Sequence, residues 1–581
     1  MILTNILLLI AISSISVSAI PVSEPALDEQ QTCTNTADSR NCWSSWFDIN
    51  TNYYSNAPET GRTVEYKWRI TNQTMALDGY ERVVLAVNGQ YPGPTLEANW
   101  GDTIMVHVTN ELKSNGTGIH WHGARMLGTP EADGAIGVTQ CPIAVIKPHS
   151  RIPFLWHATQ YGTSWRHSHF SLQCSDGVVG PIVIHGPTSA NWDIDLGPIL
   201  LTDWFHKPAF ELANEVIQAS TGLPPTADNG LINGKNKYDC VNLGSPDPKC
   251  KNSGTRYETN FQAGKKHLLR IVNTGTDVMF KFSIDGHKMK VVSMDWVPIE
   301  PYEAEVIFVA IGQRYDVIVE ANADPDDFWM RAVPQLSCFT MNSQQYNIRG
   351  IVRYDSSTLD PTSSSWSITD QCEEEEEDNL VPIVKDNVGS ANSEEDFQLS
   401  LSPASTGGKL PAFQWTVNNN HYNPNTSAPT MMPINSYGGV TIPEPYSPTE
   451  VTAIDGWTYF IIQSLLTIGY PFHLHGHDFY VLGKGIGIYK DISLHPKLHL
   501  KNPVRRDVAL LPALGYLVIA FKNDNPGAWS MHRHIAWHLH MGLAIQVIER
   551  KGEVSVNRPE EVQAVCNAWK AYDKSNGADR A

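Results

Sequence analysis

Two distant regions of the chain repeat one plan, in which two His-x-His pairs follow each other along the sequence. The first region has such pairs at 120–122 and 167–169, and the second has them at 473–475 and 532–534. In each region an apolar run follows the second pair. An internal repeat of this kind predicts two similar domains that bring their histidine pairs together.

Short runs of Val, Ile and Thr, separated by Gly, Pro and Asn, fill the rest of the chain, as at 83–87, 103–109, 178–184 and 517–521. This spacing is typical of β-sandwiches and β-barrels. The 42 Gly and 37 Pro residues also favour a turn-rich β protein over a helical bundle. We therefore predict an all-β fold.

The chain of 581 residues is too long for one core, and about 150 residues per domain predicts three or four domains. Residues 356–398 lack apolar runs and carry the acidic stretch Glu373–Asp378, so we interpret them as a solvated connector. The predicted units are a signal peptide at 1–19, an N-terminal extension at 20–59, domain one at 60–187, a histidine-poor domain two at 188–355, the connector at 356–398, domain three at 399–568 and a tail at 569–581.

The acidic balance of the chain limits its partners. The 61 Asp and Glu residues exceed the 42 Lys and Arg residues, which gives a formal charge of −19. This charge argues against nucleic acid and against an anionic membrane surface as partners. We also expect no membrane span in the mature chain.

Residues 1–19 contain an apolar run at 6–12 and end in Val17-Ser18-Ala19, as a secretory signal peptide does. The run is well short of the about 20 residues that cross a bilayer. We therefore expect a secreted protein. In that pathway the sequons at Asn72, Asn115 and Asn425 predict glycosylation.

Nine cysteines fit an oxidising compartment. Cys33 and Cys42, and likewise Cys240 and Cys250, lie close enough in the sequence to close local loops. Cys174 has no obvious mate and follows His169 by five residues, so it is either a free thiol near the histidines or a small buried side chain. The sequence favours the second interpretation.

In an extended strand alternate side chains share a face, so each His-x-His pair presents two imidazoles on one side. Its middle residue then points to the other side. Eight converging imidazoles without carboxylate ligands favour a multinuclear copper site over magnesium, calcium or manganese. A single His-x-His pair would be weak evidence for a metal site, but four pairs arranged two and two in mirrored repeats are specific evidence.

The chain resembles the multicopper oxidases, and most closely the ascomycete-type fungal laccases. The resemblance covers most of the mature chain and includes Trp100-Gly-Asp-Thr-Ile104, His120-Trp-His-Gly123, Gly312-Gln-Arg-Tyr-Asp-Val317, Pro503-Val-Arg-Arg-Asp507 and Asp524-Asn-Pro-Gly-Ala-Trp529. It implies three cupredoxin-like Greek-key domains. It also implies a trinuclear copper site between domains one and three, a blue type 1 copper in domain three, and reduction of dioxygen with electrons from a phenolic substrate.

Carried over position by position, the resemblance assigns the type 2 copper to His120 and His473. It assigns the type 3 pair to the other six histidines, which are His122, His167, His169, His475, His532 and His534. Asp133 matches a carboxylate that relays protons, although an Asp before Gly also fits a simple turn. The resemblance further implies the disulfides Cys141–Cys566 and Cys338–Cys372.

The sequence departs from the family at two type 1 copper ligands. The family has His-Cys-His where this chain has Arg533 in the middle, and it has His-Pro where this chain has Tyr470-Pro471. Only His538 and the axial Leu543 remain. A blue copper needs two imidazoles and a thiolate, so we expect about three coppers per chain and no type 1 copper.

Two functions follow as hypotheses. The first is a copper-dependent oxidase that acts on a phenolic small molecule, as in the synthesis of a fungal pigment or secondary metabolite. The alternative is a non-catalytic copper-binding scaffold, or a silent subunit that partners an active oxidase. An ordinary laccase is disfavoured by the ligand chemistry.

Three further features of the sequence give predictions. Arg166, directly before the second histidine pair, predicts another charge near the cluster. His477 is close enough to His475 to support it by a hydrogen bond. The glycines at 483, 485 and 487 lack the spacing of a phosphate loop and are interpreted as a hairpin turn.

Overall fold

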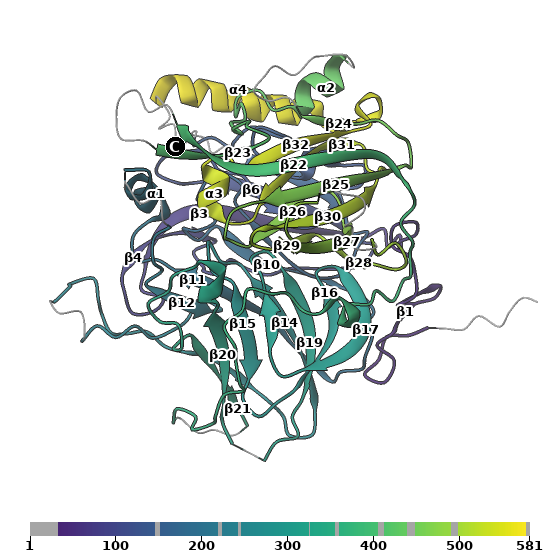
Figure 1. The fold of residues 1–581 in the computed structure, drawn as a ribbon. Coiled ribbons are helices and arrows are strands. Elements are labelled where there is room, and N and C mark those ends of the chain that lie inside the picture. The colour runs from purple at the N-terminus through teal and green to yellow at the C-terminus, as the bar shows by residue number, and fades with distance from the viewer. Residues whose placement is uncertain are drawn as a thin grey trace, which may run out of the picture.

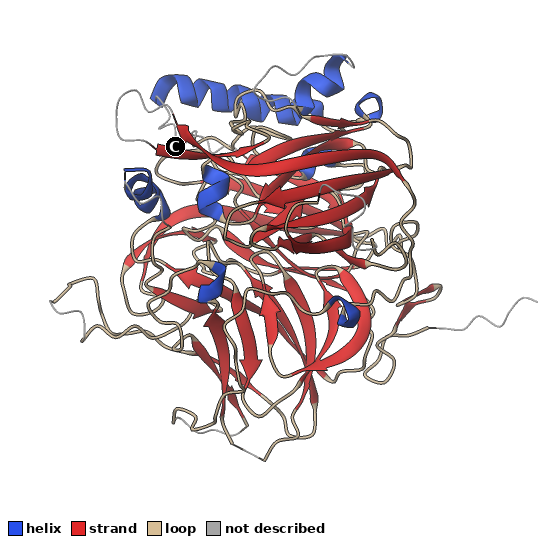
Figure 2. Ribbon diagram, in the orientation of Figure 1, coloured by secondary structure: helices blue, strands red, loops and turns tan. Residues whose placement is uncertain are grey.

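In the computed structural model strands far outnumber helices, and loops join the strands (Figures 1 and 2). It describes residues 33–145, 151–218, 224–241, 246–324, 326–354, 359–404, 412–437, 448–489 and 498–576. The predicted signal peptide lies outside the described residues. Within the described ranges no helix is long and apolar enough to cross a membrane.

The first domain is built from two four-stranded sheets. Their strand orders are β4-β3-β6-β8 and β5-β10-β9-β7, and a small ribbon of β1 and β2 precedes them. The strands are β1 (Cys42–Ser44), β2 (Phe47–Asp48), β3 (Thr63–Met75), β4 (Arg82–Val87), β5 (Leu96–Asn99), β6 (Thr103–Asn110), β7 (His120–Trp121), β8 (Arg151–His157), β9 (Gly162–His167) and β10 (Val179–His185).

The second domain, whose teal strands fill the lower half of Figure 1, pairs a six-stranded sheet with a five-stranded one. The sheets have the orders β12-β11-β14-β19-β16-β17 and β13-β21-β20-β15-β18. The strands are β11 (Ile194–Trp204), β12 (Asn229–Ile232), β13 (Tyr257–Asn260), β14 (Lys266–Asn273), β15 (Phe280–Ile284), β16 (Met289–Met294), β17 (Val297–Ala304), β18 (Ile307–Val309), β19 (Arg314–Glu320), β20 (Phe328–Pro334) and β21 (Arg349–Arg353).

The third domain repeats this two-sheet plan, with the orders β23-β22-β25-β30-β27-β28 and β24-β32-β31-β26-β29. The strands are β22 (Ala391–Ala404), β23 (Ala412–Val417), β24 (Thr449–Val451), β25 (Trp457–Ser464), β26 (Tyr470–Leu474), β27 (Phe479–Ile486), β28 (Val504–Arg506), β29 (Val508–Leu511), β30 (Gly515–Lys522), β31 (Gly527–Arg533) and β32 (Ala544–Glu549). Three two-sheet domains confirm the predicted all-β class.

The helices are short except for the last. They are α1 (Ala209–Gln218), α2 (Met431–Tyr437), α3 (Ala536–His540) and α4 (Pro559–Asn576), with 3-10 turns η1 (Pro130–Ala132), η2 (Leu336–Cys338), η3 (Glu377–Asn379) and η5 (Lys551–Glu553). Pro559 starts α4 and two glutamates lie in its first turn, as suits the positive end of a helix dipole. In Figure 1 α4 runs along the top of the molecule next to α2.

Strand β6 shows how the sequence pattern forms the core. Its residues alternate between partly exposed and buried, and Ile104, Val106 and Val108 are buried at every second position. Side chains two apart share one face of a strand, so these three pack inward together. The sequence predicted this strand from its run of Val, Ile and Thr between turn residues.

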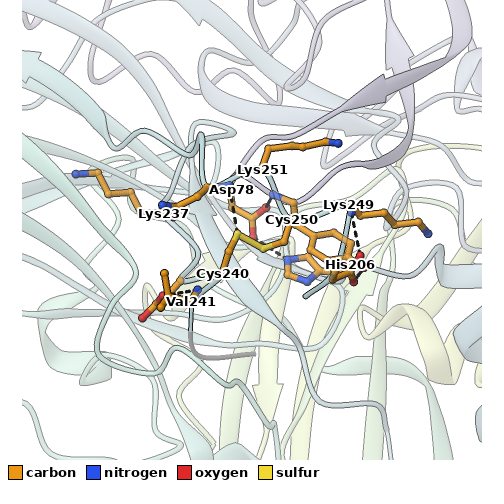
Figure 3. The surroundings of a disulfide bond; sticks show 12 residues. Asp78, His206, Lys237, Cys240, Val241, Lys249, Cys250 and Lys251 are labelled. Atoms are coloured by element: carbon orange, nitrogen blue, oxygen red, sulfur yellow. Dashed lines mark hydrogen bonds and ion pairs between the residues drawn. A yellow bond between two sulfur atoms is a disulfide. The ribbon is translucent and has the colours of Figure 1, made fainter. Parts of the chain in front are cut away.

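Four disulfides lie among the described residues, and all four match the predicted pairs. They are Cys33–Cys42, Cys240–Cys250, Cys141–Cys566 and Cys338–Cys372. Figure 3 shows Cys240–Cys250 beside Asp78 and His206, whose side chains form a hydrogen bond of 2.9 Å. The disulfide therefore clips a loop of domain two next to a turn of domain one.

Two local predictions are wrong. Glu374 is not solvated: its carboxylate accepts a hydrogen bond of 2.8 Å from Lys484, and only 4% of its side chain is exposed. The predicted hairpin turn around Gly483 and Gly485 is part of β27, which pairs with β30 and shifts register between 481 and 483. Both errors arose because a charge run and a glycine cluster were interpreted without their tertiary partners.

Candidate metal centre

Each histidine pair lies at the end of a strand. His120 belongs to β7 and His167 ends β9, and the two residues face each other in the ladder. His473 in β26 faces His532 in β31 in the same way. The second histidine of each pair follows directly beyond the strand segment or one residue after it. The predicted repeat therefore places two histidine pairs side by side in each domain.

The two domains bring their histidines into one cluster. Nε2 of His120 lies 3.4 Å from Nε2 of His473, which joins domain one to domain three. Nε2 of His169 lies 3.3 Å from Nε2 of His532, and Nδ1 of His122 lies 3.2 Å from Nε2 of His534. All eight predicted histidines thus come together.

Hydrogen bonds fix which ring nitrogen carries the proton. A carbonyl oxygen can only accept, so the nitrogen that faces it must donate. Four Nδ1 atoms donate in this way: His120 to Asp133 at 2.9 Å, His167 to Ser168 at 3.2 Å, His473 to Asp507 at 2.8 Å and His532 to Arg533 at 2.9 Å. The Nε2 atom of each ring is therefore an acceptor without a proton.

These unprotonated nitrogens face one another. Nε2 of His120 and Nε2 of His473 are both acceptors at 3.4 Å, and no hydrogen can lie between them. Such lone pairs repel unless a cation lies between them. The donor set therefore fits a bound metal ion better than an imidazole hydrogen-bond network.

Burial keeps the imidazoles neutral. Burial, with help from neighbouring histidines, lowers the pKa of His122, His167, His473 and His475 well below the ordinary value. Burial also lowers the pKa of His532 to about 4. Only neutral imidazole binds a metal, so the cluster is ready to act as a ligand set at neutral pH.

Four overlapping groups could each hold an ion, with their ligand atoms within 4.8 Å of one another. Three consist of histidines alone, and the fourth adds a carboxylate: His120, His473 and His475; His120, His122 and His167; His169, His475 and His532; and His122, His473 and Asp507. Imidazole nitrogens suit copper, zinc, iron and nickel. Because the groups share histidines, ions bound to them would lie next to one another, as in a site for several metal ions.

Asp133 lies against the cluster, as the resemblance implied. It is fully buried at the end of η1, and its carboxylate accepts a hydrogen bond of 3.0 Å from Nδ1 of His475. Its backbone carbonyl accepts the bond from His120 already described. Asp133 therefore orients two histidines at once, which a simple turn residue would not do.

A buried ion pair that the sequence analysis missed supports the other side of the cluster. Arg314 donates two hydrogen bonds to Asp507, at 2.5 and 2.7 Å. Asp507 in turn accepts from Nε2 of His122 at 3.1 Å. Burial raises the pKa of Asp507 to about 7, against the opposing charge of Arg314. Both residues lie in motifs quoted for the family resemblance, so a signal was present without an assigned role.

Arg533 points away from the histidines, as the strand alternation predicted. Its guanidinium carbon lies 3.6 Å from the ring centroid of Tyr470 and 5.5 Å from that of Trp415. The side chain is fully buried, and none of its three nitrogens has a hydrogen-bond partner among the residues that the structure describes. Burial lowers the pKa of Arg533 to about 9, so the group remains cationic at neutral pH.

The other residues of the expected type 1 site surround this arginine. The ring of His538 lies 4.3 Å from that of Trp415 and 6.5 Å from that of Tyr470, and its Nδ1 has no partner. Leu543 is fully buried. Arg533 thus stands in place of the thiolate of a type 1 site, and Tyr470 stands in place of its second imidazole. Only the imidazole of His538 and the axial leucine remain.

Two neighbouring expectations have different outcomes. Arg166 does not add charge to the cluster, because its side chain turns away, stacks 3.7 Å over Trp68 and donates to the carbonyl of Pro181. His477 does support the site: its Nδ1 donates to the carbonyl of His475 at 3.0 Å, while Glu549 holds the other nitrogen at 2.8 Å. The first prediction is wrong and the second is confirmed.

A small cavity adjoins the cluster. It has a volume of about 20 Å³, and its lining includes His169, His532 and Cys174. A volume near one or two water-sized spheres admits water or dioxygen but not an aromatic ring. Burial raises the pKa of the free Cys174 thiol to about 11, so the thiol carries its proton at neutral pH.

Comparisons with known proteins agree with this geometry. Models of the multicopper oxidase family match residues 69–189, 195–357 and 409–553. Laccase-2 of Botryotinia fuckeliana is 43% identical over 570 residues, which cover 96% of this chain and 95% of that protein. Dihydrogeodin oxidase of Aspergillus terreus is 39% identical and covers 93% of each chain.

A solved structure shows the same fold. The laccase from Botrytis aclada superposes with a TM-score of 0.88 at 41% identity, covering 94% of this chain and 98% of that one. This match confirms the three cupredoxin-like domains. The chain therefore belongs to the multicopper oxidase family of copper-dependent oxidoreductases.

Proposed function

We propose that this chain is an oxidase in which the eight histidines hold a trinuclear copper centre and in which no type 1 copper binds. The observation that carries this proposal is the approach of the unprotonated Nε2 atoms of His120 and His473 to 3.4 Å across domains one and three. Beside them, Nε2 of His475 lies 3.1 Å from Nε2 of His532 within domain three. When bound, the copper ions would supply the redox chemistry that takes electrons from a substrate and passes four of them to dioxygen. About three coppers per chain are expected.

The histidines and the residues around them would have separate roles. His120 and His473 would hold the type 2 copper, and the remaining six histidines would hold the type 3 pair. Asp133, buried against His475, would keep that ring oriented and hold a proton near the place where water forms. The cavity next to His169 is large enough to admit dioxygen.

The absence of a type 1 copper rests on charge and ligand chemistry. Arg533 places a cation where the thiolate ligand would stand, and it cannot donate a lone pair to a metal. Tyr470, on the neighbouring strand, replaces an imidazole by a neutral phenol whose pKa burial raises further. Only His538 remains as a ligand, and one imidazole does not make a blue copper site.

The substrate proposed is a phenolic small molecule, as the family resemblance implies. A relative that covers 93% of this chain bears the name of an oxidase of dihydrogeodin, which supports a role in secondary metabolism. Secretion is supported by four disulfides, which persist in oxidising compartments.

A second candidate is a non-catalytic copper-binding scaffold, or a silent subunit beside an active oxidase. The buried Arg533 favours it, because this residue removes the metal that would receive electrons. The intact set of histidines favours the oxidase, since eight imidazoles, seven of them buried, would without a metal leave polar atoms such as Nε2 of His167 unpaired.

Dioxygen consumption by the purified, copper-loaded protein separates the two candidates. With a panel of phenols and aromatic amines, the oxidase should consume dioxygen, and removal of copper by a chelator should abolish the consumption. Restoring copper should restore it. A copper-loaded protein that consumes no dioxygen with any of these compounds would contradict the oxidase and support the scaffold.

A further inference from the structure

A cavity of about 390 Å³ lies between α2 and α4, which run next to each other in Figure 1. Cavities of this size are typical of sites for small organic molecules. Its lining is mostly apolar and includes Met431, Met432, Val562 and Ala564. Thioether and aliphatic groups of this kind make favourable contacts with an aromatic ring.

One buried polar group in the lining lacks a partner. Glu131 is 4% exposed, and its Oε1 accepts a hydrogen bond of 3.2 Å from the backbone nitrogen of Asn557. Its Oε2 is buried and accepts no hydrogen bond from any described residue. A buried carboxylate oxygen without a donor is costly, so the cavity offers a place for a guest that carries an O–H or N–H group.

Glu131 is also closely connected to the histidine cluster. It belongs to the 3-10 turn η1, and Asp133 follows at the end of the same turn. The carboxylate of Asp133 lies 3.0 Å from Nδ1 of His475, and its carbonyl lies 2.9 Å from Nδ1 of His120. A guest on Glu131 would therefore be linked to two histidines through one turn of backbone.

We propose that this cavity binds the phenolic substrate, with the phenol hydroxyl donating a hydrogen bond to Oε2 of Glu131. The proposal rests on the proposed oxidase function and names the place where its electrons originate. This route avoids Arg533, and it avoids the cavity at His169, which is too small for an aromatic ring.

The reaction balances with dioxygen as the oxidant. Each phenol loses one electron and its hydroxyl proton and becomes a phenoxyl radical. Glu131 accepts the proton and passes it to solvent at the rim of the cavity. Four such oxidations release four electrons and four protons, which convert one dioxygen to two waters. Burial raises the pKa of Glu131, which makes its carboxylate a better proton acceptor.

Binding of guaiacol to the copper-loaded protein, reduced and kept free of dioxygen, tests the proposal by calorimetry. Glu131→Leu removes the acceptor and should weaken binding by on the order of tenfold. Ala564→Trp, at an exposed position of α4, should fill the cavity and weaken binding at least as much. The matched control Glu561→Leu changes an exposed glutamate of α4 outside the lining and should leave the affinity within about twofold.

The outcomes separate this inference from the proposed function. Guaiacol that binds equally well to Glu131→Leu and Ala564→Trp, or that does not bind to the unaltered protein, overturns the site. Unchanged dioxygen consumption in both variants also overturns it and leaves the oxidase standing. Binding that depends on Glu131 in a protein that consumes no dioxygen supports the site and contradicts the oxidase.

Discussion

Replacing Arg533 by Cys and Tyr470 by His together should give the protein an intense blue colour and raise its copper content from about three to about four atoms per chain. Tyr470 lies in β26 and Arg533 in β31, which are neighbours in one sheet. The guanidinium carbon of Arg533 lies 3.6 Å from the ring centroid of Tyr470, so the two side chains are already in contact. The new thiolate and imidazole would join His538, with Leu543 at the axial position. Absorption spectroscopy and metal analysis measure the result.

Matched variants show whether the colour comes from this site. Either single substitution leaves at most two of the three ligands, so neither should turn blue. Arg166→Cys places a thiol directly before another histidine pair, where the replaced arginine is also buried, and should remain colourless. A folded, copper-loaded double variant without the blue band would show that the assignment of the type 1 positions is wrong.

Replacing Arg314 by Leu should destabilise the protein by about 3 to 5 kcal/mol, because it leaves the buried carboxylate of Asp507 without its partner. Loss of this charge would favour protonation of Asp507 further, since burial already raises its pKa to about 7. The acceptor that orients His122 would then change, so copper content should fall as well. Urea unfolding and metal analysis measure both effects.

A surface ion pair provides the control for this prediction. Arg69 makes two short hydrogen bonds to Glu111 with similar geometry, but 67% of its side chain is exposed. Water screens such a pair, so Arg69→Leu should change neither the stability nor the copper content measurably. Equal effects of the two substitutions would show that the buried pair does not support the histidine cluster.

The sequence predicted the histidine cluster because its signal is local. The paired His-x-His spacings and the two strand-rich repeats are visible within a few residues each, and strand alternation then determines where Arg533 points. The same rule applies to Arg166, which adjoins His167 in β9 and therefore points to the opposite face, where it stacks on Trp68. The expectation of a charge near the cluster was wrong because it considered closeness in the sequence and not the side of the strand.

The parts that the sequence did not predict depend on contacts between distant segments. Asp507 supports His122 from 385 positions away, and Arg314 supports Asp507 from 193 positions away. Glu374 looks like one member of an acidic run until Lys484 is seen beside it. The cavity at Glu131 forms only because α4 returns from the far end of the chain to lie against η1 and α2. No short sequence pattern predicts these contacts between distant segments.

The central claim is that the histidine cluster binds copper while the type 1 position does not. The most direct test is the copper content per chain, measured together with the optical and electron spin resonance spectra of the purified protein. The account predicts about three coppers, type 2 and type 3 signals, and no blue band. A fourth copper with an intense blue band, or a protein that binds no copper at all, would contradict it.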